Sequence, residues 1–279
     1  MTALQVRERH RSFGGEVLFC SHDSPACGGS MRFSVFLPPG AGPFPVLLWL
    51  SGLTCTEENF MVKAGAQRRA SELGIALLVP DTSPRETGIH GENDDWDLGS
   101  GAGFYVDATQ APWRGRYAME TWVSEELPAF AGTYLPLDMG RCGVSGHSMG
   151  GHGALVLALR HPGRYRAVSA FAPICAPSSC PWGEKAFSAY LGTDRALWAA
   201  HDACELIRAG GPVPELLVDQ GAADPFLDVQ LRPSLLESAC EAAGVPVTLR
   251  HHEGYDHSYF FVASFIDEHL DWHSRRLGD

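Results

Sequence analysis

The chain has 279 residues, of which 45% are hydrophobic and 19% charged, and 33 acidic against 21 basic side chains give it a formal net charge of −12 at pH 7. Sequence-independent binding of nucleic acid rests on clustered Lys and Arg, whereas the longest basic clusters here are two pairs, Arg68-Arg69 and Arg275-Arg276. Uninterrupted apolar runs such as Val46–Leu50 fall far short of the roughly 20 residues that a membrane span needs. Composition therefore excludes a nucleic-acid binder and a membrane anchor, and we expect a soluble protein.

The N-terminal segment Met1–His10 is charged and lacks the apolar stretch of about 7–15 residues that an export signal requires. Cytoplasmic localisation is therefore the default expectation. Eight cysteines are too few in a chain of this length to suggest a disulfide scaffold, and none has the C-x-x-C spacing typical of zinc sites. We expect reduced cysteines and no metal.

No repeat, low-complexity tract or Ser/Gly/Pro-rich linker divides the chain. Single α/β domains often reach about 250 residues, and a composition that is 45% hydrophobic can supply one large core. The sequence therefore predicts a single domain over residues 1–279.

Short apolar runs bounded by Gly, Pro or Asp alternate with segments of helical period. The runs predict strands at Met31–Leu37, Val46–Leu50, Ile75–Val79, Arg141–Ser145, Ala167–Phe171, Glu215–Asp219 and Val247–Arg250. The periodic segments predict helices at Asn59–Leu73, Met119–Tyr134, Gly150–Arg160, Pro233–Ala243 and Phe260–Arg275. After an initial hairpin-like section, this alternation predicts an α/β fold with a mostly parallel central sheet flanked by helices on both faces. Such a sheet carries its chemistry on loops at the carboxyl ends of the strands.

Residues Gly146-His147-Ser148-Met149-Gly150 fit the G-x-S-x-G pattern of a nucleophile elbow. The pattern directly follows a predicted strand and opens a predicted helix, which is the context that the elbow requires. The alternative is a structural Gly-rich turn. We predict that Ser148 is a nucleophile.

A serine nucleophile needs a base and a group that orients the base, in the chain order Ser, acid, His for this fold. Asp224 lies in the loop after the predicted strand Glu215–Asp219, and we choose it over Asp219, which sits on the strand, and Asp228, which belongs to the next helix. The alternative for Asp224 is an Asp-Pro turn residue.

The position in the chain also indicates which of the 12 histidines is the base. His257 lies in the loop before the last predicted helix, 33 residues after Asp224 and 109 after Ser148, whereas His251 and His252 sit at a strand end. A generic histidine is more often structural, but the order favours His257.

Two backbone N–H groups are expected to bind the oxyanion of a tetrahedral intermediate. Met149, after the nucleophile, supplies one, and Leu53, in the loop after the strand Val46–Leu50, is the best candidate for the other. An ordinary Gly turn with a helix cap at Thr56 is the alternative, and both interpretations can hold together.

The sequence resembles the esterase D family of α/β-hydrolases, the S-formylglutathione hydrolases, over nearly its whole length. The matching stretches are Ser12–Gly15, Trp49–Phe60, Val79–Arg85, Gly103–Thr109, Gly146–Gly153, Ser169–Ile174, Cys180–Gly183, Lys185–Phe187 and Gly254–Tyr259. The resemblance implies an α/β-hydrolase fold and a serine thioesterase that cleaves S-formylglutathione to glutathione and formate. It also implies a cytoplasmic homodimer that has no cofactor and catalyses the last step of glutathione-dependent formaldehyde removal.

The family's triad positions fall on Ser148, Asp224 and His257, and its oxyanion positions on Leu53 and Met149. Cys55 matches a cysteine near the active site, to which the family's sensitivity to thiol reagents is attributed. The sequence departs from the family pattern in three loops, His22–Gly29, Arg85–Thr87 and Ile174–Ser179, which puts substrate preference in doubt more than chemistry.

Formyl is the smallest acyl group, so we expect a tight pocket, with Trp182, Phe104 or Phe60 as candidate walls. Ordinary core packing is the alternative for each aromatic residue. Glutathione is anionic, and candidate basic contacts are Lys63, Arg85, Arg114 and Lys185, each with a solvated surface charge as its alternative. The competing functions are a broad carboxylesterase or acyltransferase of the same fold and a non-catalytic member, which would lack a triad residue.

Overall fold

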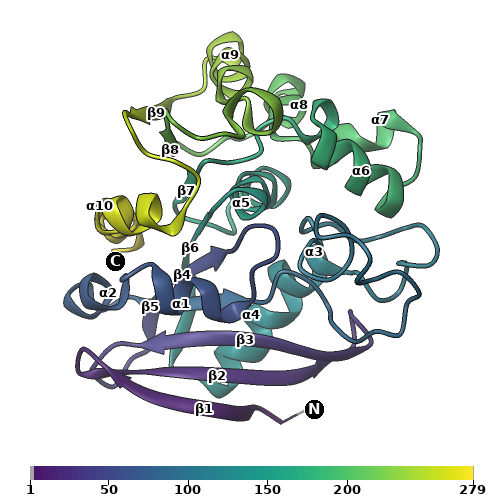
Figure 1. Cartoon of the computed structure of the whole chain (residues 1–279). Coiled ribbons are helices and arrows are strands. Elements are labelled where there is room, and N and C mark those ends of the chain that lie inside the picture. The colour runs from purple at the N-terminus through teal and green to yellow at the C-terminus, as the bar shows by residue number, and fades with distance from the viewer. Residues whose placement is uncertain (1–2, 279) are drawn as a thin grey trace.

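The computed structural model describes residues 3–278, and its strands form one sheet in the order β1-β2-β3-β5-β4-β6-β7-β8-β9 (Figure 1). The strands are β1 (Gln5–Ser12), β2 (Gly15–Ser24), β3 (Gly29–Leu37), β4 (Phe44–Leu50), β5 (Ala76–Pro80), β6 (Leu137–Gly146), β7 (Val168–Phe171), β8 (Leu216–Gly221) and β9 (Val247–His252). The pairs from β1 to β5 are antiparallel, and every pair from β5 through β4 to β9 is parallel. The predicted mostly parallel sheet is confirmed.

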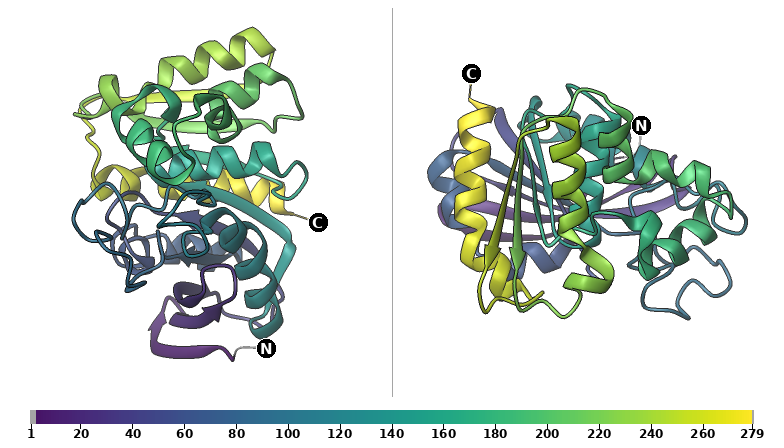
Figure 2. Two further views of the ribbon diagram at one scale, coloured as in Figure 1. Left: turned by 90° about the vertical axis from the view of Figure 1, so that its right-hand side faces the viewer. Right: turned by 90° about the horizontal axis from the view of Figure 1, so that it is seen from above.

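Helices cover the sheet on both faces. They are α1 (Glu57–Lys63), α2 (Gln67–Leu73), α3 (Met119–Thr121), the π-helix η1 (Trp122–Glu126), α4 (Leu127–Tyr134), α5 (Met149–Arg160), the 3-10 helix η2 (Pro177–Ser179), α6 (Pro181–Tyr190), α7 (Arg195–Trp198), the 3-10 helix η3 (Ala199–His201), α8 (Ala203–Ala209), the π-helix η4 (Leu227–Leu231), α9 (Pro233–Ala243) and α10 (Tyr259–Leu277). Both α5 and α10 pack on β4, β6 and β7, and α10 also packs on α1 and α2, whereas α5 packs on α8 and α8 on α9. Figure 2 shows the sheet between α10 and α9, as the predicted α/β-hydrolase fold requires.

The sequence indicated a hairpin-like section at the start of the chain, but it gave no bounds for β1 and β2. Residues Gln5–Ser12 of β1 are almost all exposed and polar, so they give no hydrophobic signal. The turn between Ser12 and Gly15 places both Phe13 and Gly14 at positive φ, 45° and 79°, which suits a two-residue hairpin. Helices α6 and α8 were also missed.

Two predicted helices have a different form. The segment Asn59–Leu73 was predicted as one helix, but it contains α1 and α2, because the chain turns at Gly65 with a φ of 69°. The predicted helix Met119–Tyr134 is helical throughout but widens to the π-turn η1 before Pro128. Proline has no N–H to donate to the Ser124 carbonyl, and the Arg164 side chain donates to that carbonyl instead.

Two long excursions, residues 81–118 and 172–202, pack on each other beside the carboxyl ends of the strands (Figure 1). Tyr190 joins them, since its hydroxyl accepts a hydrogen bond from the Gly99 N–H at 2.8 Å and donates to the Ala102 carbonyl at 3.0 Å. In the part of the chain that the structure describes, no helix combines the length and the apolar character needed to cross a membrane.

A buried polar cluster ties three parallel strands to α10. Ser169 of β7 lies at its centre, with its Oγ 2.9 Å from His269 Nδ1, 2.9 Å from His273 Nε2 and 2.8 Å from Ser145 Oγ on β6. The other ring nitrogen of His269 lies 3.3 Å from Asp219 Oδ2 on β8. The cluster therefore fixes α10 against the strands that lead to Ser148 and Asp224.

Asp219 also accepts a bidentate pair of hydrogen bonds from Arg250, both of 2.6 Å. Burial would raise the pKa of this carboxyl, but the hydrogen bonds from His269 and Arg250 outweigh that effect and hold the pKa well below its usual range. The carboxylate therefore stabilises the fold above the unfolded-state pKa of about 4, and this stabilisation is lost as the pH falls below that value.

Replacing the buried partner of Arg250 tests this account. Asp219→Asn should lower the free energy of unfolding by about 3 kcal/mol at pH 7, because it leaves a charge without its buried partner, and the difference from the native chain should shrink below about pH 4. Glu268→Gln removes an exposed partner of the same Arg250 and should cost less than about 1 kcal/mol. Urea unfolding measures both, and equal stability of Asp219→Asn and the native chain would refute the account.

Candidate active site

Ser148 sits on a sharp turn between β6 and α5. Its backbone has φ 61° and ψ −120°, and its side chain is almost wholly buried. A Cβ at Gly150 would lie 2.0 Å from the Leu50 carbonyl oxygen, and one at Gly146 would lie 2.3 Å from the Gly150 carbonyl oxygen. The glycines of G-x-S-x-G are therefore required by close backbone approach, as the elbow interpretation predicted.

Hydrogen bonds to two neighbouring strands hold this turn in place. The His147 N–H donates to the Leu50 carbonyl of β4 at 3.0 Å, and the Ser148 N–H donates to the Phe171 carbonyl of β7 at 2.9 Å. A positive φ at a non-glycine residue costs on the order of 1–3 kcal/mol. The sheet supplies the restraint that keeps the serine in this conformation.

His257 and Asp224 form a short contact, with 2.5 Å between His257 Nδ1 and Asp224 Oδ2. The Asp224 side chain is fully buried, and its other oxygen accepts the Phe226 N–H at 2.8 Å. A carboxylate in this position accepts from Nδ1–H, which leaves Nε2 of His257 free to accept a proton. Ser148 and His257 line the same pocket.

The competing residues lie elsewhere. Asp219 is bound in the buried polar cluster, and Asp228 is exposed on η4. His252 lies 3.2 Å from Asp219, and His251 lines a different hollow beside α9. Neither of these histidines lines the pocket that contains Ser148.

The loop after β4 approaches the serine closely. A Cβ at Gly52 would lie 3.1 Å from Ser148 Cβ, and Leu53 lines the pocket. The Thr54 N–H donates to the Gly101 carbonyl at 2.9 Å, and the Cys55 N–H to the Gly52 carbonyl at 3.3 Å. Among residues 3–278 the N–H groups of Leu53 and Met149 donate to no protein acceptor, so both remain available for an oxyanion.

Comparison with known proteins identifies the family. The family model of putative esterases matches residues 24–272. The chain is 51% identical to an S-formylglutathione hydrolase of Mus musculus and 52% identical to one of Paracoccus denitrificans, and each alignment covers 99% of both chains. A solved structure of an S-formylglutathione hydrolase from Agrobacterium tumefaciens superimposes with a TM-score of 0.96 at 49% identity, covering 98% of this chain and 99% of that one.

The chain belongs to the S-formylglutathione hydrolase family of esterases. The family resemblance inferred from the sequence is therefore confirmed, and the chain is a hydrolase. The structure brings the predicted nucleophile Ser148 and the predicted base His257 to one pocket and places Asp224 on Nδ1 of His257.

The pocket of this hydrolase has a volume of about 220 Å³ and mainly apolar walls. Trp182, predicted as a wall, lines it together with three aromatic residues that the sequence analysis did not select, Trp96, Phe226 and Tyr259. The rings contact one another, with centroids 5.6 Å apart for Trp96 and Trp182 and 4.8 Å apart for Trp182 and Phe226. Phe226 and Tyr259 each follow a predicted triad residue by two positions, which was the signal available in the sequence.

Three other candidate contacts do not line this pocket. Phe104 is wholly buried, with its ring 6.0 Å from that of His152. Phe60 is also buried and stacks on Trp49, with 4.1 Å between the ring centroids. Lys185 lies 3.0 Å from Asp95 and 2.5 Å from Asp97, so its charge is already paired. Phe104 and Phe60 therefore pack in the core, and Lys185 links α6 to the excursion of residues 81–118.

Two further titratable groups line the pocket. Burial, followed by the nearby charge of His257, lowers the pKa of His147, whose ring centroid lies 4.5 Å from that of His257. Burial raises the pKa of the Cys55 thiol, although Lys63 acts against it. Both groups therefore stay neutral near pH 7. Residues 3–278 contain no cluster of three or more His, Cys, Asp or Glu side chains that could hold a metal.

Replacing Asp224 tests the triad geometry. Asp224→Asn should lower kcat for p-nitrophenyl acetate by roughly 10³–10⁴-fold, because an amide neither holds Nδ1–H nor stabilises the imidazolium. The matched control is Asp228→Asn, four residues along on η4, which should change kcat less than about twofold. Steady-state kinetics with circular dichroism as a check on folding measure both, and a similar effect of the two substitutions would exclude Asp224 from the triad.

Proposed function

We propose that this hydrolase cleaves S-formylglutathione to glutathione and formate. The observation that carries the proposal is the 2.5 Å contact of His257 Nδ1 with the buried Asp224 carboxylate, in a pocket shared with Ser148. Relatives about half identical over the full chain, named S-formylglutathione hydrolases, support the substrate.

The reaction proceeds in two acyl-transfer steps. Ser148 Oγ attacks the formyl carbon while His257 Nε2 takes its proton, and Asp224 stabilises the imidazolium. The N–H groups of Leu53 and Met149 bind the oxyanion, and the intermediate collapses to formyl-serine as the thiol leaves with the proton from His257. Water, deprotonated by His257, then attacks the formyl-serine and releases formate.

The pocket suits a small acyl group on a large thiol. Its walls are apolar, and its volume of about 220 Å³ lies below the usual range of about 300–1,000 Å³ for ligand sites. Apolar walls strengthen the interaction of the two N–H donors with the oxyanion, because a lower local dielectric increases electrostatic interactions. The acyl end of the thioester therefore belongs beside Ser148, and the peptide extends past Trp96 toward solvent.

We also propose that the whole chain acts as a single catalytic domain in a cytoplasmic homodimer that catalyses the last step of glutathione-dependent formaldehyde removal. The family resemblance motivates the dimer and the pathway. All eight cysteines are free thiols, which suits a reducing compartment.

Substrate comparison tests the proposed reaction. The steady-state rate on S-formylglutathione should exceed the rates on S-acetylglutathione and p-nitrophenyl acetate by orders of magnitude, because the pocket accommodates the smallest acyl group best. Ser148→Ala, the control, should abolish all three activities. Rates on the simple ester that match or exceed those on the formyl thioester would instead assign a general carboxylesterase.

Lys63 is the cation best placed to receive a carboxylate of glutathione. Its ammonium lies 6.0 Å from the centroid of Tyr259, which lines the pocket, and it has no carboxylate partner among residues 3–278. Lys185 and Arg85, by contrast, are paired with aspartates, and Arg114 is exposed away from the pocket walls.

Charge reversal at Lys63 should therefore act on substrate binding. Lys63→Glu should raise KM for the glutathione thioester by about 3–10-fold, which corresponds to the loss of a partly exposed charge pair, and leave kcat and p-nitrophenyl acetate turnover unchanged. Arg114→Glu introduces the same charge change elsewhere and should leave KM unchanged. An unaltered KM in Lys63→Glu removes this residue from the binding site.

A further inference from the structure

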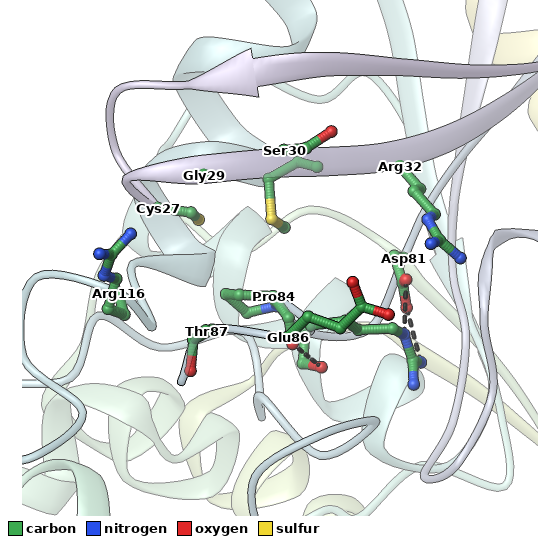
Figure 3. Close-up of a pocket in the computed structure, with 12 residues that line it drawn as sticks. Cys27, Gly29, Ser30, Arg32, Asp81, Pro84, Glu86, Thr87 and Arg116 are labelled. Carbon is green, nitrogen blue, oxygen red and sulfur yellow. Dashed lines mark hydrogen bonds and ion pairs between the residues drawn. The ribbon is translucent and has the colours of Figure 1, made fainter. Parts of the chain in front are cut away.

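A second cavity of about 290 Å³ lies between strand β3 and the loop that follows β5. It shares no lining residue with the pocket of Ser148. Figure 3 shows Arg116 at one end of this cavity and Arg32 toward the other, with Pro84 and Glu86 between them. The cavity therefore presents cationic groups at two separate ends.

This cavity is cationic although the chain is acidic. Its lining contains the guanidinium groups of Arg32, Arg85 and Arg116 and the carboxylates of Asp81 and Glu86, so the lining has a net charge of +1 against −12 for the whole chain. Within residues 3–278 the Arg32 side chain has no hydrogen bond or ion pair, and the Arg116 side chain donates only to the Gly28 carbonyl. Guanidinium groups with free donors are suited to bind carboxylates.

Arg85 adds a donor at the Arg32 end. Its Nε and Nη2 bind the two oxygens of Asp81 at 2.7 and 2.8 Å, and Nη2 also donates to the Cys55 carbonyl at 2.9 Å. Nη1 donates to no group in the described part of the chain. These contacts hold the guanidinium rigidly, and its free edge can bind an anion without breaking them.

The middle of the cavity differs from its ends. Glu86 has no hydrogen-bond or ion-pair partner among residues 3–278, and its carboxylate lies between the two arginine ends (Figure 3). Met31 and Pro84 provide apolar surface, and burial raises the pKa of the Cys27 thiol to about 12, so this thiol stays neutral. An ammonium group and a short aliphatic chain suit these surroundings.

We propose that this cavity binds an elongated zwitterion with a carboxylate at each end and one ammonium group, the chemistry shared by L-glutamate and γ-glutamyl peptides. One carboxylate binds Arg116 and the other binds Arg32 and Arg85. The ammonium group pairs with Glu86, and the aliphatic chain lies on Met31 and Pro84. The net charge of −1 on such a ligand complements the +1 of the lining. This binding does not depend on the proposed thioesterase activity.

Calorimetric titration of the full chain tests the site with L-glutamate, glutathione and glutarate as probes. L-glutamate should bind saturably, and glutarate, which has the same carbon chain without the ammonium group, should bind at least about tenfold more weakly. Arg32→Gln and Arg116→Gln should each weaken L-glutamate binding at least about tenfold. Arg114→Gln, two positions from Arg116 and outside the cavity, is the matched control and should bind as the native chain does.

The outcomes separate the possible ligands. Glutathione binding that weakens in Arg116→Gln assigns γ-glutamyl peptides to the cavity. Glutathione binding that persists in Arg116→Gln while L-glutamate binding is lost limits the ligands to free amino acids. Absence of saturable binding of both L-glutamate and glutathione, or equal affinity in the native chain and both arginine variants, overturns the proposal. Unchanged thermal unfolding midpoints show that the variants are folded.

Discussion

The left-handed backbone at Ser148 is the constraint on which the rest of the site depends. A residue with a side chain adopts φ 61° only when its surroundings fix it. Here β4 and β7 accept hydrogen bonds from the turn, and Gly146 and Gly150 allow three backbone segments to approach within contact distance. The serine is thus presented at the carboxyl edge of the sheet, where the loops after β4 and β8 and the loop before α10 also meet.

A bound substrate is recognised by groups close to the pocket and not by the net charge of the chain. A chain with net charge −12 repels an anionic substrate at long range, and the lining of the catalytic pocket contains no lysine or arginine. Under the proposed function, hydrophobic contact, the N–H groups of Leu53 and Met149, and Lys63 therefore have to recognise the substrate. The ion pairs of Lys185 with Asp95 and Asp97 show that a basic residue near a site is not necessarily free to bind a ligand.

The sequence predicted the elements whose patterns arise from burial. The central strands are apolar throughout and were located to within a few residues, and the elbow could be recognised because its glycines are set by backbone contact. The exposed strand β1 has no such pattern. Trp96 was missed because it reaches the pocket through an excursion folded on α6, and Phe104 was misplaced because its ring packs inward against His152. Such placements depend on contacts between distant segments.

Helix α10 has two roles at opposite ends. Its first residue follows the loop that carries His257, and farther along the same helix His269 and His273 join the buried cluster of β6, β7 and β8. During synthesis Ser148 and Asp224 leave the ribosome before His257 does. Because His257 adjoins a helix that docks on strands already made, the proposed triad is complete only once α10 has packed.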